Sequence, residues 1–370
     1  MKIGLIGAGR LGICFALLLE QVGYDVVVSD VRDDYVIGLN NRIIKTNEPE
    51  VVELLDDARN FVAVLDNIEV IKQCDIIYTL VATPSLPDGS YDVSSVWQVI
   101  NDIQSCDFPV HGKAFVVGCT TNPGDCENFQ KQLDAFGVDV YYNPEFIAQG
   151  SIVKDLRNAD MVLIGGTGKH LDNIKEIYHK IQINEPKIYN MSTTAAELVK
   201  LAVNCYLTTK ITYANMVGEV MTLAGLESEI DDVLLAIGSD SRVGSKYLKY
   251  GYGFGGPCLP RDNRSFAAYA KKLGLQYNLG ITTDDFNNEH SNFLKNYFVK
   301  KNINNLPFCF HYISYKEGTD IVTESQQYRL CLDLLNEGYK VYVIEDYVKS
   351  QCDERIIFEI PNEEVFWIEL

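Results

Sequence analysis

The sequence lacks the features that mark a zinc protein, a secreted protein or a membrane protein. Ten cysteines are scattered without a repeated CxxC or a His-rich partner segment, which argues against zinc. Their even number is weak evidence for disulfides in a chain of 370 residues. No apolar run approaches the length of a membrane span, and the start MKIGLIGAG leads into helix-compatible sequence rather than a cleavage site. We therefore expect a reduced, cytoplasmic protein with no bound metal.

Basic side chains are also scarce. The chain has 32 lysines and arginines against 51 aspartates and glutamates, so its formal charge is −19. A field of this sign repels nucleic acid and anionic membranes, and an anionic ligand must be held by local positive features. Hydrophobic content of 47% in a chain of this length is typical of an ordinary globular protein with two or three domains.

Short apolar runs dominate the first half of the chain. They lie at 2–6, 26–28, 76–81, 115–117, 138–142 and 162–164. Helix-like stretches alternate with them, and residues 13–19 read as a buried helix. This alternation predicts an α/β domain over residues 1–190, with a parallel sheet covered by helices on both faces.

The pattern changes after Ser192. Residues 193–217 contain neither glycine nor proline and predict one long helix, capped by Ser192, Thr193 or Thr194. Helical segments are expected to continue to about residue 300, so 191–300 forms a central helical domain.

Strand-like runs return from Pro307. An amphipathic stretch at 326–336 precedes an apolar run at 339–344, which predicts a second, short α/β domain over 301–370.

A glycine fingerprint follows the first apolar run. Gly7, Gly9 and Gly12 form a GxGxxG between a strand and a helix, with Asp30 at the end of the next strand. In this context the glycines make a tight turn, admit a pyrophosphate and allow close packing. Asp30 favours NAD, because it would accept hydrogen bonds from a ribose 2′-hydroxyl and repel a 2′-phosphate. Arg32 is the residue that keeps NADP open.

Four further residues are expected near this cofactor. Arg10 and Leu11 lie within the fingerprint at the start of the helix. Thr83 in VATP and Thr120 in GCTTNPG follow later strands, at the carboxyl edge where such sheets bind ligands. Either threonine alone would be an ordinary turn residue.

The segment GYGFGGPCLPRD at 251–262 places Cys258 in a glycine-rich loop. Pro257 and Pro260 stiffen the turn, and Arg261 favours a thiolate. The alternative is a tight turn around a buried, inert cysteine.

A thiol beside a nicotinamide suggests an oxidation that continues past an aldehyde. A second hydride can leave only after a nucleophile has made the carbon tetrahedral, so Cys258 would form a thiohemiacetal and then a thioester. Hydrolysis of the thioester requires a base and a group that stabilises the oxyanion.

Candidates for these two tasks lie elsewhere in the chain. Glu145 in YNPEF is a candidate base. Glu197, Lys200 and Asn204 share one face of the long helix, and Lys200 and Asn204 could bind one oxyanion. By pattern alone, a solvated helix face is the better interpretation of these three residues.

Several motifs together resemble the UDP-glucose/GDP-mannose dehydrogenase family over most of the chain. They are GAGRLG, VATPS, CTTNPG, NPEFIAQGSIVKDL, AAELVKLAVN, SDSRVG, GFGGPCLPRD and YKEGTD. The resemblance implies a Rossmann-like NAD-binding domain, a central long-helix domain and a short C-terminal α/β domain that binds the nucleotide sugar. It implies oxidation of UDP-glucose to UDP-glucuronate with NAD in two steps.

The resemblance also implies roles for individual residues. Cys258 matches the nucleophile, Glu145 the hydrolytic base, and Lys200 and Asn204 the oxyanion partners. A further pair matches the residues that orient a water, namely Asp262 and Thr120.

Other positions match contacts to the substrate. Arg242 in DSRVG resembles an arginine that reaches the substrate of a neighbouring subunit, which implies a homodimer built around the long helix. The remaining matches are Phe146, Ile147, Tyr247, Leu248, Tyr250, Gly255 and Lys316.

The chain departs from the family pattern at several positions. Gln149 stands where a second acid is usual, Met161 and Thr323 where arginines are usual, and Arg261 where a lysine is usual. The chain stops at Leu370, so the closing domain is expected to be shorter than in the family. These departures bear on UDP binding more than on the redox chemistry.

Three alternatives stay open at this point. Another nucleotide sugar, such as GDP-mannose or UDP-N-acetylmannosamine, would use the same carbon chemistry. A relative that binds the nucleotide sugar without catalysis is a second class. A simple hydroxyacid dehydrogenase is a third, although a single oxidation needs no thiol.

Overall fold

A computed structural model describes residues 1–370 as two compact units, Met1–Lys200 and Leu201–Leu370. The boundary between the units falls within the long helix α9 (Thr193–Leu223). The division into three domains predicted from the sequence stays a prediction. None of the helices is both long and apolar enough to cross a membrane.

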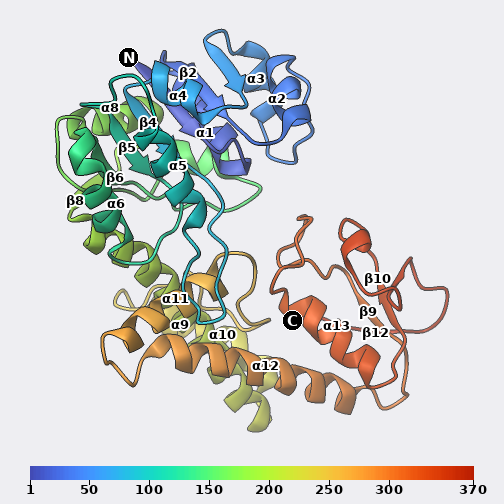
Figure 1. Ribbon diagram of the computed structural model, residues 1–370. Helices are drawn as coiled ribbons and strands as arrows, with labels where there is room; N and C mark the ends of the chain where they lie inside the picture. Colours follow the sequence, from blue (N-terminus) through green and yellow to red (C-terminus); the bar gives the residue numbers. More distant parts are fainter. The chain divides into compact units, whose positions relative to one another are not determined.

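The first unit is built on an eight-stranded sheet (Figure 1). Its strands are β1 (Lys2–Ile6), β2 (Asp25–Ser29), β3 (Phe61–Val64), β4 (Ile76–Thr79), β5 (Ala114–Val117), β6 (Asp139–Tyr142), β7 (Met161–Gly165) and β8 (Lys187–Met191). The order is β3-β2-β1-β4-β5-β6-β7-β8, and β3 to β6 run parallel. The strand order reverses between β1 and β4, which is where sheets of this type bind dinucleotides. The predicted α/β architecture is confirmed.

One strand pair differs from the predicted parallel sheet. β7 runs antiparallel to β6, and β8 then runs parallel to β7. The segment between β6 and β7 does not cross back over the sheet, and Asn143, the first residue after β6, donates from Nδ2 to the carbonyl of Leu163 in β7 at 2.9 Å. Apolar runs alone could not show this, because they carry no direction.

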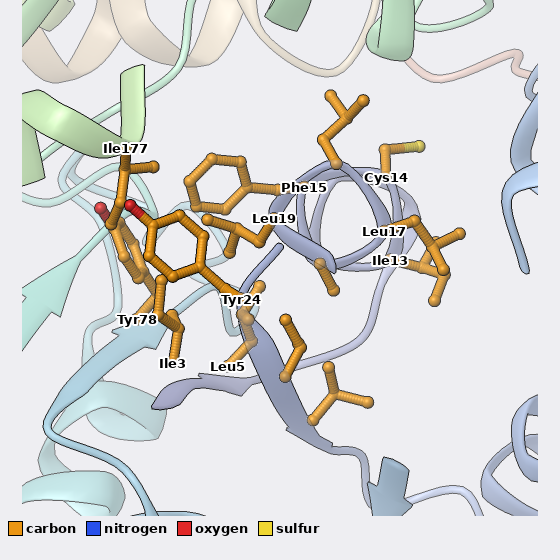
Figure 2. Packing of buried hydrophobic residues seen from close by; sticks show 14 of the residues in the cluster. Ile3, Leu5, Ile13, Cys14, Phe15, Leu17, Leu19, Tyr24, Tyr78 and Ile177 are labelled. Atoms are coloured by element: carbon orange, nitrogen blue, oxygen red, sulfur yellow. The ribbon is translucent and has the colours of Figure 1, made fainter. Parts of the chain in front are cut away.

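Helices cover both faces of the sheet, as predicted. One hydrophobic cluster includes residues from α1 (Arg10–Gln21), α3 (Val51–Asp57), α7 (Ile152–Arg157) and α8 (Leu171–Ile181). The other includes residues from α4 (Asn67–Gln73), α5 (Ser94–Gln104) and α6 (Asp125–Leu133). Figure 2 shows the first cluster, where Phe15 and Leu19 of α1 lie among side chains of the sheet and α8. This packing fixes α1, and therefore the glycine turn in front of it. A further helix, α2 (Asp33–Asn40), follows β2.

The second unit contains helices and a small parallel sheet. Its helices after α9 are α10 (Ile230–Ser239), α11 (Leu259–Lys272), α12 (Leu279–Lys301) and α13 (Gln326–Asn336). Its strands are β9 (Phe308–Phe310), β10 (Val341–Val343), β11 (Ile357–Phe358) and β12 (Phe366–Trp367), in the order β11-β10-β9-β12. The closing α/β element is confirmed, and α13 has the predicted bounds.

The long helix α9 starts as predicted and extends further. The Ser192 hydroxyl accepts from the backbone nitrogen of Ala195 at 3.3 Å, so Ser192 is the capping residue. The helix continues past Gly218 to Leu223. A β-carbon at Gly218 would lie 2.0 Å from the ring of Tyr250, so this glycine provides space for an aromatic ring and does not end the helix.

Candidate active site

The glycine turn after β1 has the geometry of a pyrophosphate site. Gly7 has a φ of +99°, and a β-carbon there would lie 2.8 Å from the carbonyl oxygen of Leu80, which follows β4. A β-carbon at Gly12 would lie 2.1 Å from the carbonyl oxygen of Gly7. A β-carbon at Gly9, in contrast, would meet nothing within 4 Å, and no side chain caps α1. The turn therefore leaves room at Gly9 in front of α1, and this cradle fits a dinucleotide diphosphate.

Asp30 lies directly after β2 and is paired with Arg32. Two guanidinium nitrogens of Arg32 donate to the two carboxylate oxygens at 2.7 and 2.9 Å. Burial acts to raise the pKa of Asp30, but the hydrogen bonds from Arg32 outweigh it and lower the pKa. Arg32 also lies over the ring of Tyr35, 4.1 Å from its centre. Asp30 is thus a fixed anion suited to a ribose hydroxyl, and its partner is the group that would meet a 2′-phosphate.

The other residues predicted near the cofactor lie around the same edge of the sheet. Arg10 donates from Nη1 to Gln149 Oε1 at 3.1 Å, and Leu11 is half-buried against the α1 core. Thr83 is buried after β4, and Thr120 is half-buried after β5. Their contact with a cofactor stays a prediction.

Glu145 lies in the segment after β6 and is half-buried. The hydroxyl of Tyr178 in α8 is hydrogen-bonded to Glu145 Oε1 and lies 2.7 Å from Asn143 Oδ1. Burial raises the pKa of Glu145 to about 7, although Tyr178 and the charge of Lys200 act in the opposite direction. A carboxyl group of this pKa is suited to proton transfer near neutral pH.

Lys200 of α9 belongs to the same cluster. Its Nζ donates to the backbone carbonyl of Glu145 at 2.8 Å and lies 4.8 Å from the ring centre of Phe146. Two of the three ammonium hydrogens are not used by this bond, so Lys200 can still donate to an oxyanion. Phe146 and Ile147 are half-buried, each against a different core cluster.

Glu197 does not lie on a solvated helix face, and that interpretation is wrong for this residue. Its side chain is fully buried and accepts from Thr121 Oγ1 at 2.8 Å and from the backbone nitrogens of Gly124 and Cys126 at 2.7 and 2.9 Å. Burial raises the pKa of Glu197 to about 7 against these hydrogen bonds. Glu197 is far from α6 in the sequence, but it accepts hydrogen bonds from backbone amides at the amino end of that helix. These bonds fix the loop that carries Thr120.

Cys258 is exposed in the second unit and precedes α11 as its N-cap residue. The alternative of a buried cysteine is therefore wrong, and the reactivity of the thiol stays a prediction. The loop before it is packed tightly, because a β-carbon at Gly253 or Gly255 would lie 2.1 Å from Asn287 Oδ1 or 2.4 Å from the carbonyl oxygen of Glu324. The sulfur is presented at the amino end of a helix, where the partial positive charge stabilises an anion.

Asp262 and Asn204 lie with Cys258 in this unit. The backbone nitrogen of Asp262 donates to the carbonyl of Cys258 at 2.9 Å, and Asn204 Nδ2 donates to Asp262 Oδ2 at 2.5 Å. Asp262 is buried, whereas Asn204 is half-buried. The structure thus brings together three of the predicted catalytic residues. Arg261, in the first turn of α11, donates to the carbonyl of Pro257 at 3.4 Å.

The predicted substrate contacts around α10 differ in exposure. Arg242 is highly exposed and pairs with Asp240 at 2.7 Å. Tyr247 is exposed with a φ of +63°. Leu248 is buried and Tyr250 half-buried in a cluster with α9 and α10, so their side chains pack against protein, and a contact with nucleotide stays a prediction.

The positions near the C-terminus that the sequence links to the substrate lie in the loop between β9 and α13. Lys316 is exposed there, as is Thr323. Arg264 of α11 pairs with Asp284 at 3.1 Å and with Glu324 at 2.8 Å, which ties the Cys258 helix to this loop.

Sequence reasoning missed Tyr178 and Asn143. Asn143 adjoins the PEF motif at a strand end, and this position is the one signal that could have identified it. Tyr178 lies in α8, far along the chain, and no local pattern distinguishes it from a core tyrosine.

Two models of one protein family match the chain. The NAD binding domain of the UDP-glucose/GDP-mannose dehydrogenase family matches residues 1–182, and the central domain of that family matches residues 194–289.

Individual relatives match over most of their length. A UDP-glucose 6-dehydrogenase of Haloferax volcanii is 27% identical, over 96% of this chain and 85% of the relative. A putative UDP-glucose 6-dehydrogenase of Bacillus subtilis is 29% identical, over 93% and 81%. A solved UDP-glucose dehydrogenase from Pyrobaculum islandicum is similar with a TM-score of 0.87 at 25% identity, over 97% of this chain and 86% of that one.

Proposed function

The chain belongs to the UDP-glucose/GDP-mannose dehydrogenase family, and on this basis we propose that it oxidises UDP-glucose to UDP-glucuronate with NAD through a thioester on Cys258. The observation that carries the proposal is the exposed thiol at the start of α11, beside the Asp262 and Asn204 pair. The names of the relatives in Haloferax volcanii and Pyrobaculum islandicum support UDP-glucose as the sugar nucleotide.

The residues around the glycine turn fit a nicotinamide dinucleotide. The free space at Gly9 and the uncapped start of α1 suit the pyrophosphate, and Asp30 suits an unphosphorylated ribose. When bound, NAD accepts one hydride in each of two successive oxidations. Arg32, held by Asp30, offers no preformed site for a 2′-phosphate, which supports NAD over NADP.

Side chains of the protein carry out the remaining steps of the proposed reaction. After the first oxidation, the Cys258 sulfur attacks the aldehyde carbon, and the carbonyl oxygen takes up a proton to give a thiohemiacetal. The second oxidation removes hydride from that carbon while the hydroxyl proton passes to water, which leaves a thioester. Glu145 then removes a proton from water, the water oxygen attacks the thioester carbon, and the sulfur leaves. Lys200 donates to the oxygen that becomes negative during this step.

A homodimer is part of the proposal. Tyr206, Tyr213 and Val220 are exposed at seven-residue intervals on α9, so they share one face of the helix. Large apolar side chains on one helix face are typical of a surface that another subunit covers. The exposure of Arg242 supports its predicted role toward a neighbouring subunit.

The amount of NADH formed per molecule of sugar nucleotide tests the proposed reaction. We expect two NADH per UDP-glucose and an acid product, with little turnover of GDP-mannose or UDP-N-acetylmannosamine. One NADH per substrate would contradict the thioester route, and faster turnover of another sugar nucleotide would replace the substrate but keep the chemistry. Binding of UDP-sugars without NADH would identify a non-catalytic relative.

A further inference from the structure

We propose that Asn143 and Tyr178 set the pH at which Glu145 ionises, because Asn143 competes with Glu145 for the single hydroxyl proton of Tyr178. Both are positioning residues, since they act on the base rather than on the substrate. The inference rests on the proposed role of Glu145, but its test below does not need that role.

The orientation of the Asn143 amide is fixed by the backbone. Its nitrogen donates to the carbonyl of Leu163 at 2.9 Å, and a carbonyl can only accept. The amide oxygen therefore faces the Tyr178 hydroxyl, 2.7 Å away. On its other side the same hydroxyl meets Glu145 Oε1. Three oxygens thus lie in a row, and the central one carries one proton.

Counting protons decides which state satisfies all three oxygens. If Glu145 is protonated, its hydroxyl donates to Tyr178, and Tyr178 donates to Asn143, so every contact is a hydrogen bond. If Glu145 is ionised, Tyr178 must turn its proton to the carboxylate. Asn143 Oδ1 then faces a lone pair, and a buried acceptor loses its partner. The asparagine therefore favours the protonated acid.

The other charged or titratable groups around Glu145 act in different ways. Lys200 in α9 is a cation beside it and favours ionisation. Tyr78 in β4 lies close enough to interact with the Glu145 charge, but its buried hydroxyl makes no hydrogen bond. Burial is the largest influence and raises the pKa of Glu145 to about 7. Tyr178 is the one side-chain hydrogen-bond donor to the carboxylate among these groups, so competition for its proton affects Glu145 directly.

The arrangement matters for a base that must wait through two oxidations. A protonated Glu145 adds no negative charge to its surroundings while these oxidations take place. It becomes a base once its own proton has passed to water, and the Tyr178 hydroxyl then turns its proton toward the carboxylate, a rotation that requires no backbone movement.

Infrared titration of the carboxyl C=O band of the full-length protein, without substrate, tests the inference. Subtracting the spectrum of Glu145→Gln assigns the band. We expect Asn143→Leu to lower the titration midpoint of Glu145 by roughly one pH unit. Without the competing amide oxygen, the Tyr178 proton is free to bond the ionised carboxylate, and one hydrogen bond corresponds to a shift of about this size. Tyr178→Phe is expected to raise it, because the ionised form loses its donor.

Tyr141→Phe is the matched control. Tyr141 is also buried in the sheet, and its hydroxyl accepts from the backbone nitrogen of His170 at 3.2 Å, away from Glu145. It should leave the midpoint unchanged. NAD affinity and thermal unfolding identify any variant that fails to fold.

Opposite shifts in Asn143→Leu and Tyr178→Phe would support the inference. Shifts in the same direction, no shift in either, or a wild-type midpoint at the ordinary value of a glutamate would overturn it. If the proposed function is wrong, no NADH will form with any sugar nucleotide. The titration can still be interpreted in that case, because it is carried out without substrate.

Discussion

Gly9 in the first unit and the glycines before α11 in the second unit use the missing side chain for opposite purposes. In the loop after β1, a β-carbon at Gly9 would meet nothing within 4 Å. In the loop before α11, the space beside Gly253 and Gly255 is already filled by Asn287 and by the backbone at Glu324. Both loops lead into the amino end of a helix. The first leaves room for a ligand, whereas the second is closed by protein atoms and presents a sulfur.

This difference shows that glycine content alone does not identify a binding loop. Gly9 of the first loop allows an anion to approach the backbone, whereas Gly7 and Gly12 of the same loop allow close packing. The glycines of the second loop allow the chain to pack closely, which restricts the position of Cys258 at the start of α11. We therefore expect a substitution at Gly9 to reduce ligand affinity and a substitution at Gly255 to reduce stability.

The largest effect is expected at the sulfur that the second loop presents. Cys258→Ala should reduce formation of the acid by about 10³-fold or more, as for loss of a covalent nucleophile. Product analysis by mass spectrometry measures it. Cys106→Ala is the control, because this half-buried cysteine in the first unit donates only to the carbonyl of Asp102 at 3.3 Å. Undiminished acid formation by the alanine variant would exclude Cys258 as the nucleophile.

Because the second loop is closely packed, we expect a larger side chain in it to lower the stability of the protein. In Gly255→Ala the new β-carbon would lie 2.4 Å from a backbone oxygen, so the loop must shift. We expect a loss of about 1–3 kcal/mol in the free energy of unfolding. Gly251→Ala, where nothing lies within 4 Å, should change stability little. Equal losses in urea denaturation of the two variants would show that contact with Glu324 does not restrict the loop.

Because the first loop has open space at Gly9, we expect a larger side chain there to lower the affinity for NAD. Gly9→Ala is expected to weaken NAD binding by roughly tenfold, because a methyl group would stand where the pyrophosphate approaches. Stability should stay unchanged, since a β-carbon at Gly9 would contact no protein atom. Calorimetric titration with NAD measures the affinity. A stability loss with normal affinity would mean that this glycine also serves packing, and the contrast between the loops would disappear.

Asp30 sharpens the assignment of the first loop to NAD. Asp30→Ala should raise the KM for NAD by several-fold and increase the use of NADP, because it removes the carboxylate and releases Arg32 from its pair at 2.7 Å. The ratio of kcat/KM for the two cofactors is the measurement. Arg59→Ala, in an exposed loop of the same unit, is the control. An unchanged ratio would place recognition of the ribose elsewhere.

The smallest expected effect concerns pH. Glu145 has a pKa raised by burial from 4.5 to about 7 in the folded protein, so the folded state binds a proton more tightly than the unfolded state. This contribution to stability is fully present below pH 4.5 and is lost as pH rises through 7. Glu145→Gln should therefore flatten the fall in unfolding free energy across this range, by on the order of 1 kcal/mol. A slope identical to that of the wild type would show that Glu145 ionises normally.

Much of the fold followed from local pattern. The alternation of apolar runs gave the strands β1, β2, β4, β5, β6 and β7, and the absence of glycine and proline gave α9. The reversal at β7 and the continuation of α9 past Gly218 could not be predicted, because both depend on a partner distant in the chain, Asn143 reaching Leu163 and Tyr250 filling the space at Gly218.

The sequence by itself determined which chemical groups the protein possesses: a fingerprint for a dinucleotide, a cysteine in a glycine-rich loop, and a lysine and an asparagine one helical turn apart. Only the tertiary structure decided the state of these groups. Burial and the placement of α8 against the sheet enclose Glu145 with Tyr178, and the packing of α9 against the loop before α6 turns Glu197 into a buried acceptor. Residue type fixes what a side chain can donate or accept, but the dielectric around it and its partners arise from segments that meet only when the chain is folded.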